Sequence, residues 1–263
     1  IIKNFVSKPF IKINKIYLDI NFKNFKKLND NRNIALKNKV IYKEYNENVN
    51  ATIKYKDQRT PVRIKLKGGV VEHHLGKNWS FKVRTRKSNL FGLNDFALMH
   101  AQRRNYLLEW YARKMFEEEG FIYKDYKFIN LYINGENKGI YVIDENYTEA
   151  LSVKNNRKEG IYIRFGSDIN FYWYGSAQVL YDDESEVLYQ IELHGCCGYE
   201  DGLQQTNIDV LNQQINSNTK NETIKNFNIA KRLLEDFRRN KKSPEEIFDL
   251  DLMAKSFALS DLL

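Results

Sequence analysis

Apolar and basic residues alternate along the stretch from Val62 to Lys67, which is the clearest strand pattern in the chain. Because successive side chains of a strand point to opposite faces, this stretch predicts a strand with one buried face and one basic face. Gly68 and Gly69 end the pattern. A second alternating stretch, residues 79–84, predicts another strand and places Lys82 on its polar face.

The same periodicity predicts further strands and a hairpin. Strands are predicted at residues 15–20, 51–55 and 160–165, with loops at residues 29–33, 57–61 and 89–96. Asn134 and Gly135 form a dipeptide that is favoured in tight turns between antiparallel strands. They predict a hairpin of residues 126–133 and 138–144.

Helices are predicted where apolar residues recur at spacings of three and four. Residues 104–119 place Leu107 and Trp110 on one side and a polar stripe with Glu109 and Arg113 on another. Gly120 is a typical residue after a helix end. Similar signals predict a short helix capped by Asn21, a helix at residues 224–237 and a helix start at residues 243–246.

The order of these elements predicts an α+β fold with two lobes. Residues 1–150 are expected to form an antiparallel sheet lobe with a packed helix. Residues 151–263 are expected to begin a second, mostly helical lobe. A polar loop rich in Asn and Gln is predicted near residues 203–226.

Composition narrows the class of protein. With 42% hydrophobic and 14% aromatic residues among 263, the chain is expected to fold around a sizeable core. The net charge of +8 would suit phosphate groups, but the basic residues are scattered among acidic ones. No RNA-recognition signature or basic recognition helix occurs, so no nucleic-acid partner is expected. No run approaches the ~18 apolar residues of a membrane span.

The ends of the chain lead us to expect a fragment. The chain starts at Ile1 rather than Met, and an apolar helical stripe stops at Leu263 without a cap. A leader or anchor could have been trimmed, which leaves both a cytoplasmic and an envelope-associated location open. The two cysteines, Cys196 and Cys197, are adjacent, which argues against a disulfide framework and a zinc site.

The basic strand and its glycines are candidates for a phosphate site. Glycine lets backbone N–H groups approach phosphate oxygens, and flanking cations such as Arg63 and Lys67 would neutralise them. A basic strand that ends in Gly68 and Gly69 is also typical of an ordinary hairpin corner. No G-x-x-x-x-G-K-[ST] sequence occurs, which excludes a Walker loop.

Lys82 is a second candidate, because a mid-strand ammonium can reach the phosphates of a nucleotide. Such a lysine needs a carboxylate to hold it, and Glu109 on the following helix is the nearest candidate in chain order. In the alternative interpretation, Lys82 faces solvent and Glu109 pairs with Arg113 along its own helix. The residues alone favour this alternative. His73 and His74 have no third ligand at suitable spacing, so no metal site is predicted.

These pieces, in this order, resemble the CotH kinase family, the spore-coat-protein-H type of atypical protein kinases. The resembling residues are 63–68 (RIKLKG), 77–83 (KNWSFKV), 91–92 with 96, 104–110 (RNYLLEW), 119–120, 133–135 through 139–141, 145, 157–165 and 248–262. The likeness therefore runs along most of the chain.

The resemblance implies a kinase-like fold that binds ATP with Mg²⁺ and transfers the γ-phosphoryl group to Ser or Thr of a protein substrate. It implies that Lys82 faces the phosphates with Glu109 as its helix partner, and that residues 141–145 form the hinge facing the adenine. The nucleotide-binding residues that it implies are Arg63, Lys67, Gly68, Lys82, Glu109 and Glu145.

The resemblance also places the family's metal-binding and catalytic aspartates beyond Leu263. No catalytic or metal-binding residue is therefore expected within this chain, which is expected to be inactive alone. The alternative function is that of a non-catalytic coat or envelope protein that keeps the fold as a scaffold for interactions.

Overall fold

The structure is a computed structural model that describes residues 13–38, 41, 43–68, 71–85, 89–158, 160–165, 179–182, 187–190, 208–210 and 221–261. The expectations about Cys196, Cys197 and Gly69 lie outside the described residues. Most of the predicted Asn/Gln-rich loop lies outside them too.

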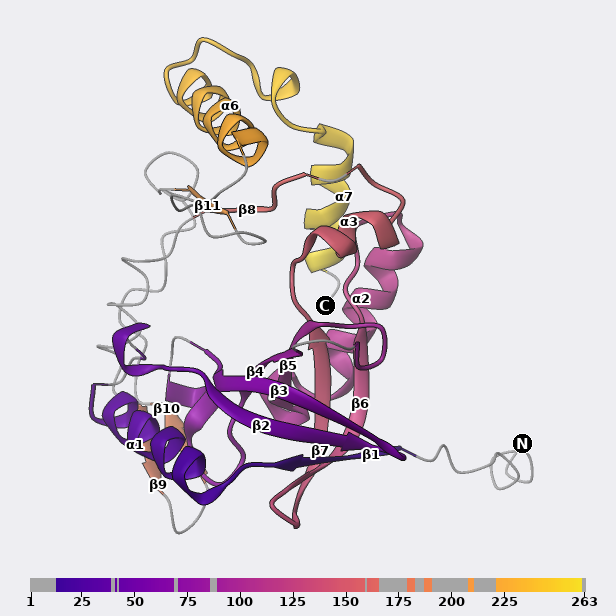
Figure 1. The fold of residues 1–263 in the computed structure, drawn as a ribbon. Coiled ribbons are helices and arrows are strands. Elements are labelled where there is room, and N and C mark those ends of the chain that lie inside the picture. Colours follow the sequence, from indigo (N-terminus) through magenta and orange to yellow (C-terminus); the bar gives the residue numbers. More distant parts are fainter. Residues whose placement is uncertain are drawn as a thin grey trace, which may run out of the picture.

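A closed β-barrel forms the centre of the described chain, with strand order β1-β2-β3-β4-β5-β7-β6 (Figure 1). Neighbouring strands are antiparallel except β1 and β6, which run parallel and pair Asn14 with Ile129 and Leu18 with Ile133. The strands are β1 (Asn14–Asp19), β2 (Val49–Tyr55), β3 (Gln58–Leu66), β4 (Phe81–Thr85), β5 (Asp95–His100), β6 (Tyr126–Ile133) and β7 (Glu136–Glu145). Short 3-10 turns lie at η2 (Lys43–Tyr45), η3 (Val71–His74), η4 (Ala101–Arg104) and η6 (Pro244–Glu246).

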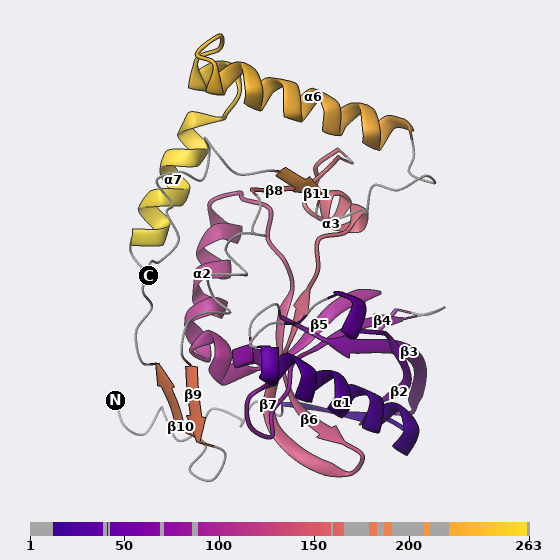
Figure 2. The same ribbon diagram turned by 90° about the vertical axis from the view of Figure 1, so that its left-hand side faces the viewer.

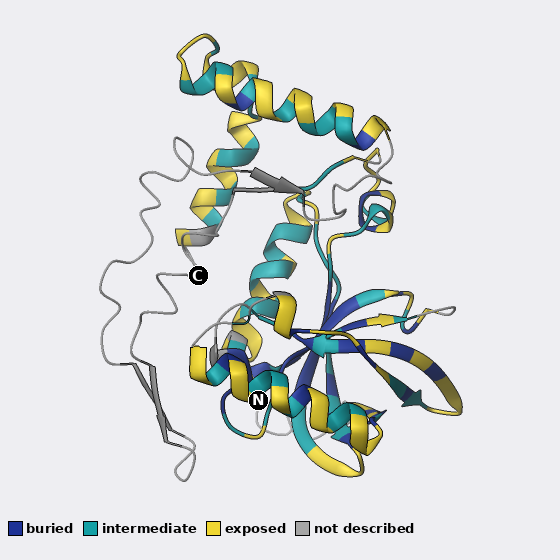
Figure 3. Cartoon of the chain, turned by 60° about the vertical axis from the view of Figure 1, so that its left-hand side comes forward, coloured by how far each residue is buried: buried dark blue, intermediate teal, exposed yellow. Residues whose placement is uncertain are grey.

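The barrel interior is filled by every second side chain of the strands. Val62, Ile64 and Leu66 of β3 point inward with Phe81 and Val83 of β4, and all are buried. The basic residues between them therefore lie on the outer face, as the alternation predicted. Figure 3 shows that buried residues are concentrated in these strands.

A second, smaller core lies between the outer face of the barrel and helix α2 (Leu107–Glu118). It contains Ala97 and Met99 of β5 and Val142 of β7, and Trp110 of α2 packs against it. Strand β5 is thus buried on both faces, since its alternate residues Phe96 and Leu98 belong to the barrel interior. The prediction of a loop through residue 96 was wrong there, because a strand buried on both faces has no polar alternation.

Helix α1 (Phe22–Asn38) packs against β2 and β3. Asn21 caps it as predicted, since its side-chain oxygen accepts a hydrogen bond of 2.9 Å from the backbone N–H of Asn24. The helix continues through residues 29–33, which were predicted to be a loop. Leu28 and Ala35 are buried on either side of this polar stretch, and their burial carries the helix across it.

The hairpin prediction is confirmed. Asn134 and Gly135 connect β6 and β7 with φ values of 49° and 88°, which is the left-handed backbone of a tight hairpin turn. The loop predicted at residues 57–61 is in fact a tight turn. Strand β3 already begins at Gln58, and Lys56 in the turn has φ 52°. The strand predicted at residues 160–165 is limited to β8 (Ile163–Phe165).

After the barrel, the described chain forms three helices and two small sheets. The helices are α3 (Glu149–Lys154), α6 (Asn221–Arg238) and α7 (Leu250–Asp261). Strand β8 pairs with β11 (Ile208–Val210), and β9 (Val179–Asp182) pairs with β10 (Val187–Gln190). The loop predicted near residues 203–226 therefore contains a short strand, and its last residues belong to α6.

Helix α7 lies beside α2 in both Figure 1 and Figure 2, and Lys255 Nζ is 3.1 Å from Glu119 Oε2 at this contact. The capping box predicted at Ser243 is present, since Ser243 N donates to Glu246 Oε2 over 2.9 Å. It opens the turn η6 rather than α7 itself. No helix among the described residues is long and apolar enough to cross a membrane.

The mixture of sheet and helices confirms the α+β class. The sheet differs from the expected kinase-like antiparallel lobe, because β1 and β6 run parallel and join its two edges into a closed barrel. Closure removes both sheet edges from solvent.

Candidate nucleotide-binding site

Four cations lie in two cross-strand pairs on the outer face of β3 and β4. Lys65 is directly opposite Lys82, and Arg63 is directly opposite Arg84. Like charges at directly opposite positions destabilise a sheet unless an anion offsets them. The outer face of these strands is therefore a region of concentrated positive charge.

Asp95 on β5 is the carboxylate that faces these cations. Its Oδ2 lies 2.7 Å from Arg84 Nε, and its Oδ1 lies 3.8 Å from Lys82 Nζ. Burial lowers the pKa of Lys82, although the neighbouring Asp95 acts against this shift. Asp95 thus contacts one member of each cation pair, namely Lys82 and Arg84.

Asp144 on β7 is the buried centre of a second ionic cluster. Its Oδ1 lies 3.0 Å from Arg113 Nη1 and 3.1 Å from Lys124 Nζ, and its Oδ2 lies 3.5 Å from Lys67 Nζ. Burial alone would raise the pKa of Asp144, but Lys124, Arg113 and Lys67 lower it below its ordinary value. Asp144 therefore stays charged at neutral pH and links the end of β3, helix α2 and the segment before β6.

Arg113 extends this cluster to Glu109, one turn earlier on α2. Arg113 Nη2 lies 2.7 Å from Glu109 Oε1 and Arg113 Nε lies 3.0 Å from the same oxygen. The two carboxylates raise the pKa of Arg113 although its burial lowers it. A continuous chain of ion pairs thus runs from Glu109 through Arg113 and Asp144 to Lys67.

The predicted ion pair between Lys82 and Glu109 is wrong. Lys82 faces Asp95, and Glu109 pairs with Arg113 along its own helix, as in the alternative interpretation. The physical reason is the missed strand β5, which places Asp95 beside Lys82, whereas Arg113 lies one helical turn from Glu109.

Gly68 has a packing role. Its φ is +105°, and a β-carbon there would come within 2.3 Å of His73 Cδ2 and 2.9 Å of His73 Cβ. The imidazole of His73 therefore occupies the space that the absent side chain leaves free. The prediction that Gly68 opens its backbone to phosphate stays a prediction, with this side of the residue already covered.

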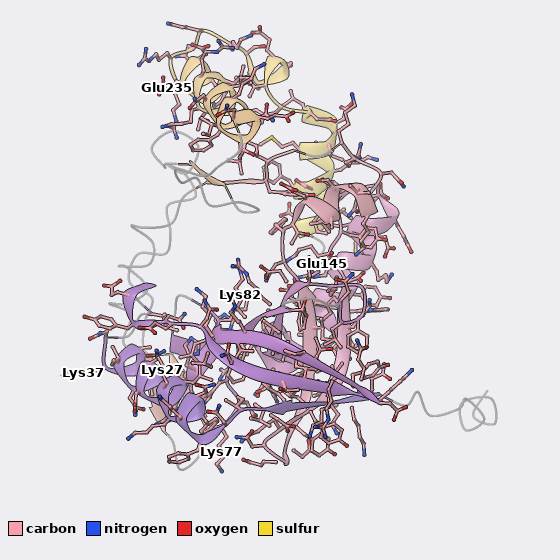
Figure 4. The ribbon with its side chains drawn as sticks, viewed as in Figure 1. Lys27, Lys37, Lys77, Lys82, Glu145 and Glu235 are labelled. Carbon is pink, nitrogen blue, oxygen red and sulfur yellow. The ribbon has the colours of Figure 1, made fainter. Side chains whose placement is uncertain are left out.

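Glu145 ends β7 with its side chain buried and paired. Its Oε2 accepts a hydrogen bond from Asp125 N over 2.8 Å and lies 2.7 Å from Lys154 Nζ. Figure 4 shows Glu145 and Lys82 at the same end of the barrel. Residues 141–145, the predicted hinge, form the end of β7, which pairs with β5 on one side and, through Asp144, with β6 on the other. That this backbone faces the adenine stays a prediction.

The structure thus brings Arg63, Lys67 and Lys82 to the outer face of neighbouring strands. Glu109 is linked to Lys67 through Arg113 and Asp144, and no ion pair among the described residues links it to Lys82. Glu145 is turned toward Lys154. Among the described residues, no group of three or more His, Cys, Asp or Glu side chains could hold a metal ion.

Comparison with known proteins decides the family. The family described as CotH kinase protein matches residues 64–249. The chain belongs to the CotH kinase family. The match begins in β3 and extends into the segment after η6, so it includes Lys67, Lys82, Asp95, Glu109 and Asp144 of this CotH-family chain. A search of curated proteins found no match.

Sequence reasoning missed the carboxylates that organise the site. Asp144 follows the apolar residues 140–143, and a charged residue inside a buried run is a signal for a buried ion pair. Asp95 carried no comparable signal, because its strand has no alternating pattern. Arg113 was recognised only as a partner of Glu109.

Proposed function

We propose that this CotH-family chain contributes the nucleotide-binding lobe of an atypical protein kinase. In this proposal, the kinase binds ATP with a divalent metal and transfers the γ-phosphoryl group to Ser or Thr of a protein. Residues 1–150 form the nucleotide-binding lobe, and residues 151–263 belong to a second lobe. The proposal rests on family membership together with the cations on the outer face of β3 and β4.

The adjacent cation pairs are the observation that carries the proposal. Lys65 and Lys82 are fixed opposite each other by the strand register, as are Arg63 and Arg84. A polyphosphate laid along this face would offset the like-charge repulsion across both pairs, whereas Asp95 contacts one member of each. Phosphoryl transfer depends chiefly on positioning and on neutralising the phosphate charge, which are the contributions such a face supplies.

The residues present fit the phosphates better than they fit the metal. Arg63, Lys65 and Lys82 would bind the phosphate oxygens, and Lys67 would remain ion-paired with Asp144. The carboxylates nearby, Asp95 and Asp144, are already ion-paired to cations of the chain. No reaction step through a metal therefore follows from the described residues.

Titration with a non-hydrolysable ATP analogue tests the proposal. Calorimetry would compare the wild-type chain with Lys82→Ala and with the control Lys37→Ala, whose lysine is exposed near the end of α1 (Figure 4). Loss of one charge-assisted contact is expected to weaken binding by roughly 10-fold or more in Lys82→Ala and to leave the control unchanged. Equal affinities would remove Lys82 from the site.

The non-catalytic scaffold remains the second candidate. It is favoured by the absence of a Lys82–Glu109 pair among the described contacts and by the full ion pairing of Asp144 and Glu145 within the fold. Because the chain is expected to be inactive alone, the titration with the ATP analogue separates the two functions. Saturable binding that Lys82→Ala weakens would support the kinase lobe. No saturable binding would support the scaffold.

A further inference from the structure

A cavity of about 660 Å³ opens at the end of the barrel away from Lys82 and Glu145. It is formed where β4 begins, where β6 ends and where β7 begins, and α1 contributes Phe25 and Arg32 to its wall. Figure 4 shows Lys77, another lining residue, at the opposite end of the barrel from Lys82. Mouths of β-barrels are frequent ligand sites, and this volume lies within the usual range of roughly 300–1,000 Å³.

The cavity has an apolar and aromatic floor. Phe81 and Ile133 reach it from the barrel core, where both are buried. Trp79 stacks on Phe25 with ring centroids 5.6 Å apart and planes 11° apart. The indole is fixed further, because its Nε1 donates to Gly76 O over 2.9 Å. Such a floor suits a flat or aliphatic body and needs little reordering on binding.

The rim of the cavity is cationic. Arg32, Lys77 and Lys138 line it, and Glu136 is the only carboxylate among the described lining residues. Glu136 Oε1 lies 2.7 Å from Lys138 Nζ. The described lining thus contains three cationic side chains and one carboxylate, and this composition favours an anionic ligand.

Arg32 is already positioned for such a ligand. Its Nε donates to His74 O over 2.6 Å and its Nη2 donates to Gly76 O over 3.2 Å. Its guanidinium carbon lies 5.1 Å from the centroid of the Trp79 ring. These contacts fix a guanidinium beside the aromatic floor, and a fixed cation loses little conformational freedom when it binds an anion.

We propose that this barrel mouth is a second ligand site, separate from the nucleotide-binding face, for a small amphipathic anion with an apolar body and a carboxylate head. Strand β4 separates the cavity from the nucleotide-binding face, because its successive side chains point to opposite faces of the sheet. Phe81 points inward to the cavity, whereas the next residue, Lys82, points outward to the cation face.

Calorimetric titration with 3-phenylpropanoate tests this site, because a carboxylate probe does not mimic a phosphate chain. Acetate supplies the head alone and 3-phenylpropan-1-ol supplies the body alone. Saturable binding of 3-phenylpropanoate, at least 10-fold tighter than either part, is expected. Equal affinity for the alcohol, or no saturable binding of the acid, would overturn the proposal. Displacement of the acid by ATP would overturn its separation from the nucleotide face.

Charge variants of the cavity rim are expected to change the affinity for 3-phenylpropanoate in opposite directions. The double variant Lys77→Gln/Lys138→Gln is expected to weaken 3-phenylpropanoate binding at least 10-fold, because it removes two rim cations. Glu136→Gln is expected to tighten binding several-fold, because it releases Lys138 from its carboxylate. Lys37→Gln is the matched control and should change nothing. If Glu136→Gln weakens binding while the chain stays folded by circular dichroism, the charge argument is wrong.

Discussion

The imidazole of His73 lies against the α-carbon of Gly68, at the point where the basic strand β3 turns away from the barrel. A methyl group on Gly68 would meet the Cδ2, Cγ and Cβ atoms of His73 within 3 Å. Because the root of the His73 side chain is among these atoms, a rotation of the ring cannot relieve the clash. Packing thus makes glycine necessary at this corner, apart from any role in binding.

Gly68→Ala is therefore expected to lower the free energy of unfolding by roughly 2 to 4 kcal/mol, from overpacking together with backbone strain. The matched control is Gly92→Ala, because Gly92 has φ +81° but no atom lies within 4 Å of the position that its methyl group would take. Gly92→Ala should lower the free energy of unfolding by only about 1 kcal/mol. Urea unfolding of both variants measures the difference, and equal losses would show that His73 does not exclude a side chain.

Lys82 is expected to be energetically coupled to Asp95 and not to Glu109. A double-mutant cycle with Lys82→Ala and Asp95→Ala should give a coupling of about 0.2 to 1 kcal/mol, as for a partly exposed pair at 3.8 Å. The cycle with Glu109→Ala should give a value near zero. Thermal or urea unfolding measures both cycles. A larger coupling to Glu109 would restore the kinase-like pair that the structure does not show.

Asp144→Asn is expected to be among the most destabilising polar substitutions in the barrel. It would leave Lys67, Arg113 and Lys124 around a neutral amide in a buried setting. Breaking a buried ion pair in this way costs about 3 to 5 kcal/mol. Asp19→Asn is the control, because its partly exposed pair with Lys54 should be worth about 1 kcal/mol or less. A similar loss in both variants would contradict the buried cluster.

His74 is expected to make the fold less stable in mild acid. Burial lowers its pKa from 6.5 to about 4, and Arg32 and Arg103 act in the same direction. Between these values the unfolded chain takes up a proton that the folded chain does not. Stability therefore falls as the pH drops from 6.5 toward 4, by up to roughly 3 kcal/mol.

Urea unfolding across this pH range measures the effect. His74→Gln carries no ionisable group at this position, so its stability should decline less steeply than that of the wild type over the same range. Parallel profiles for the two proteins would show that His74 does not titrate with the low pKa that its burial implies.

The sequence was informative wherever structure depends on neighbouring residues. The alternation from Val62 to Lys67 predicted both the strand and its basic outer face, and Asn134 with Gly135 predicted the hairpin. Asn21 was identified as a helix cap from its own side chain. Each of these features is decided within a few residues, so a single sequence contains the information.

The rest depended on contacts between distant segments. Residues 96–99 are apolar without alternation, so nothing marked them as a strand that brings Asp95 beside Lys82. Without β5, Asp95 was assigned to a loop, and Glu109, the first carboxylate of the following helix, was chosen instead. Closure of the barrel through β1 and β6 was likewise invisible, because it joins segments far apart in the chain.

That closure has a consequence for how the protein is made. The backbone of Ile20 donates to the side chain of Asn134, 114 residues later, beside the parallel β1–β6 seam. During synthesis, β1 therefore cannot pair with β6 until the segment that ends 114 residues after Ile20 has been made. Such long-range pairing slows folding and leaves β1 open to mispairing in the interval.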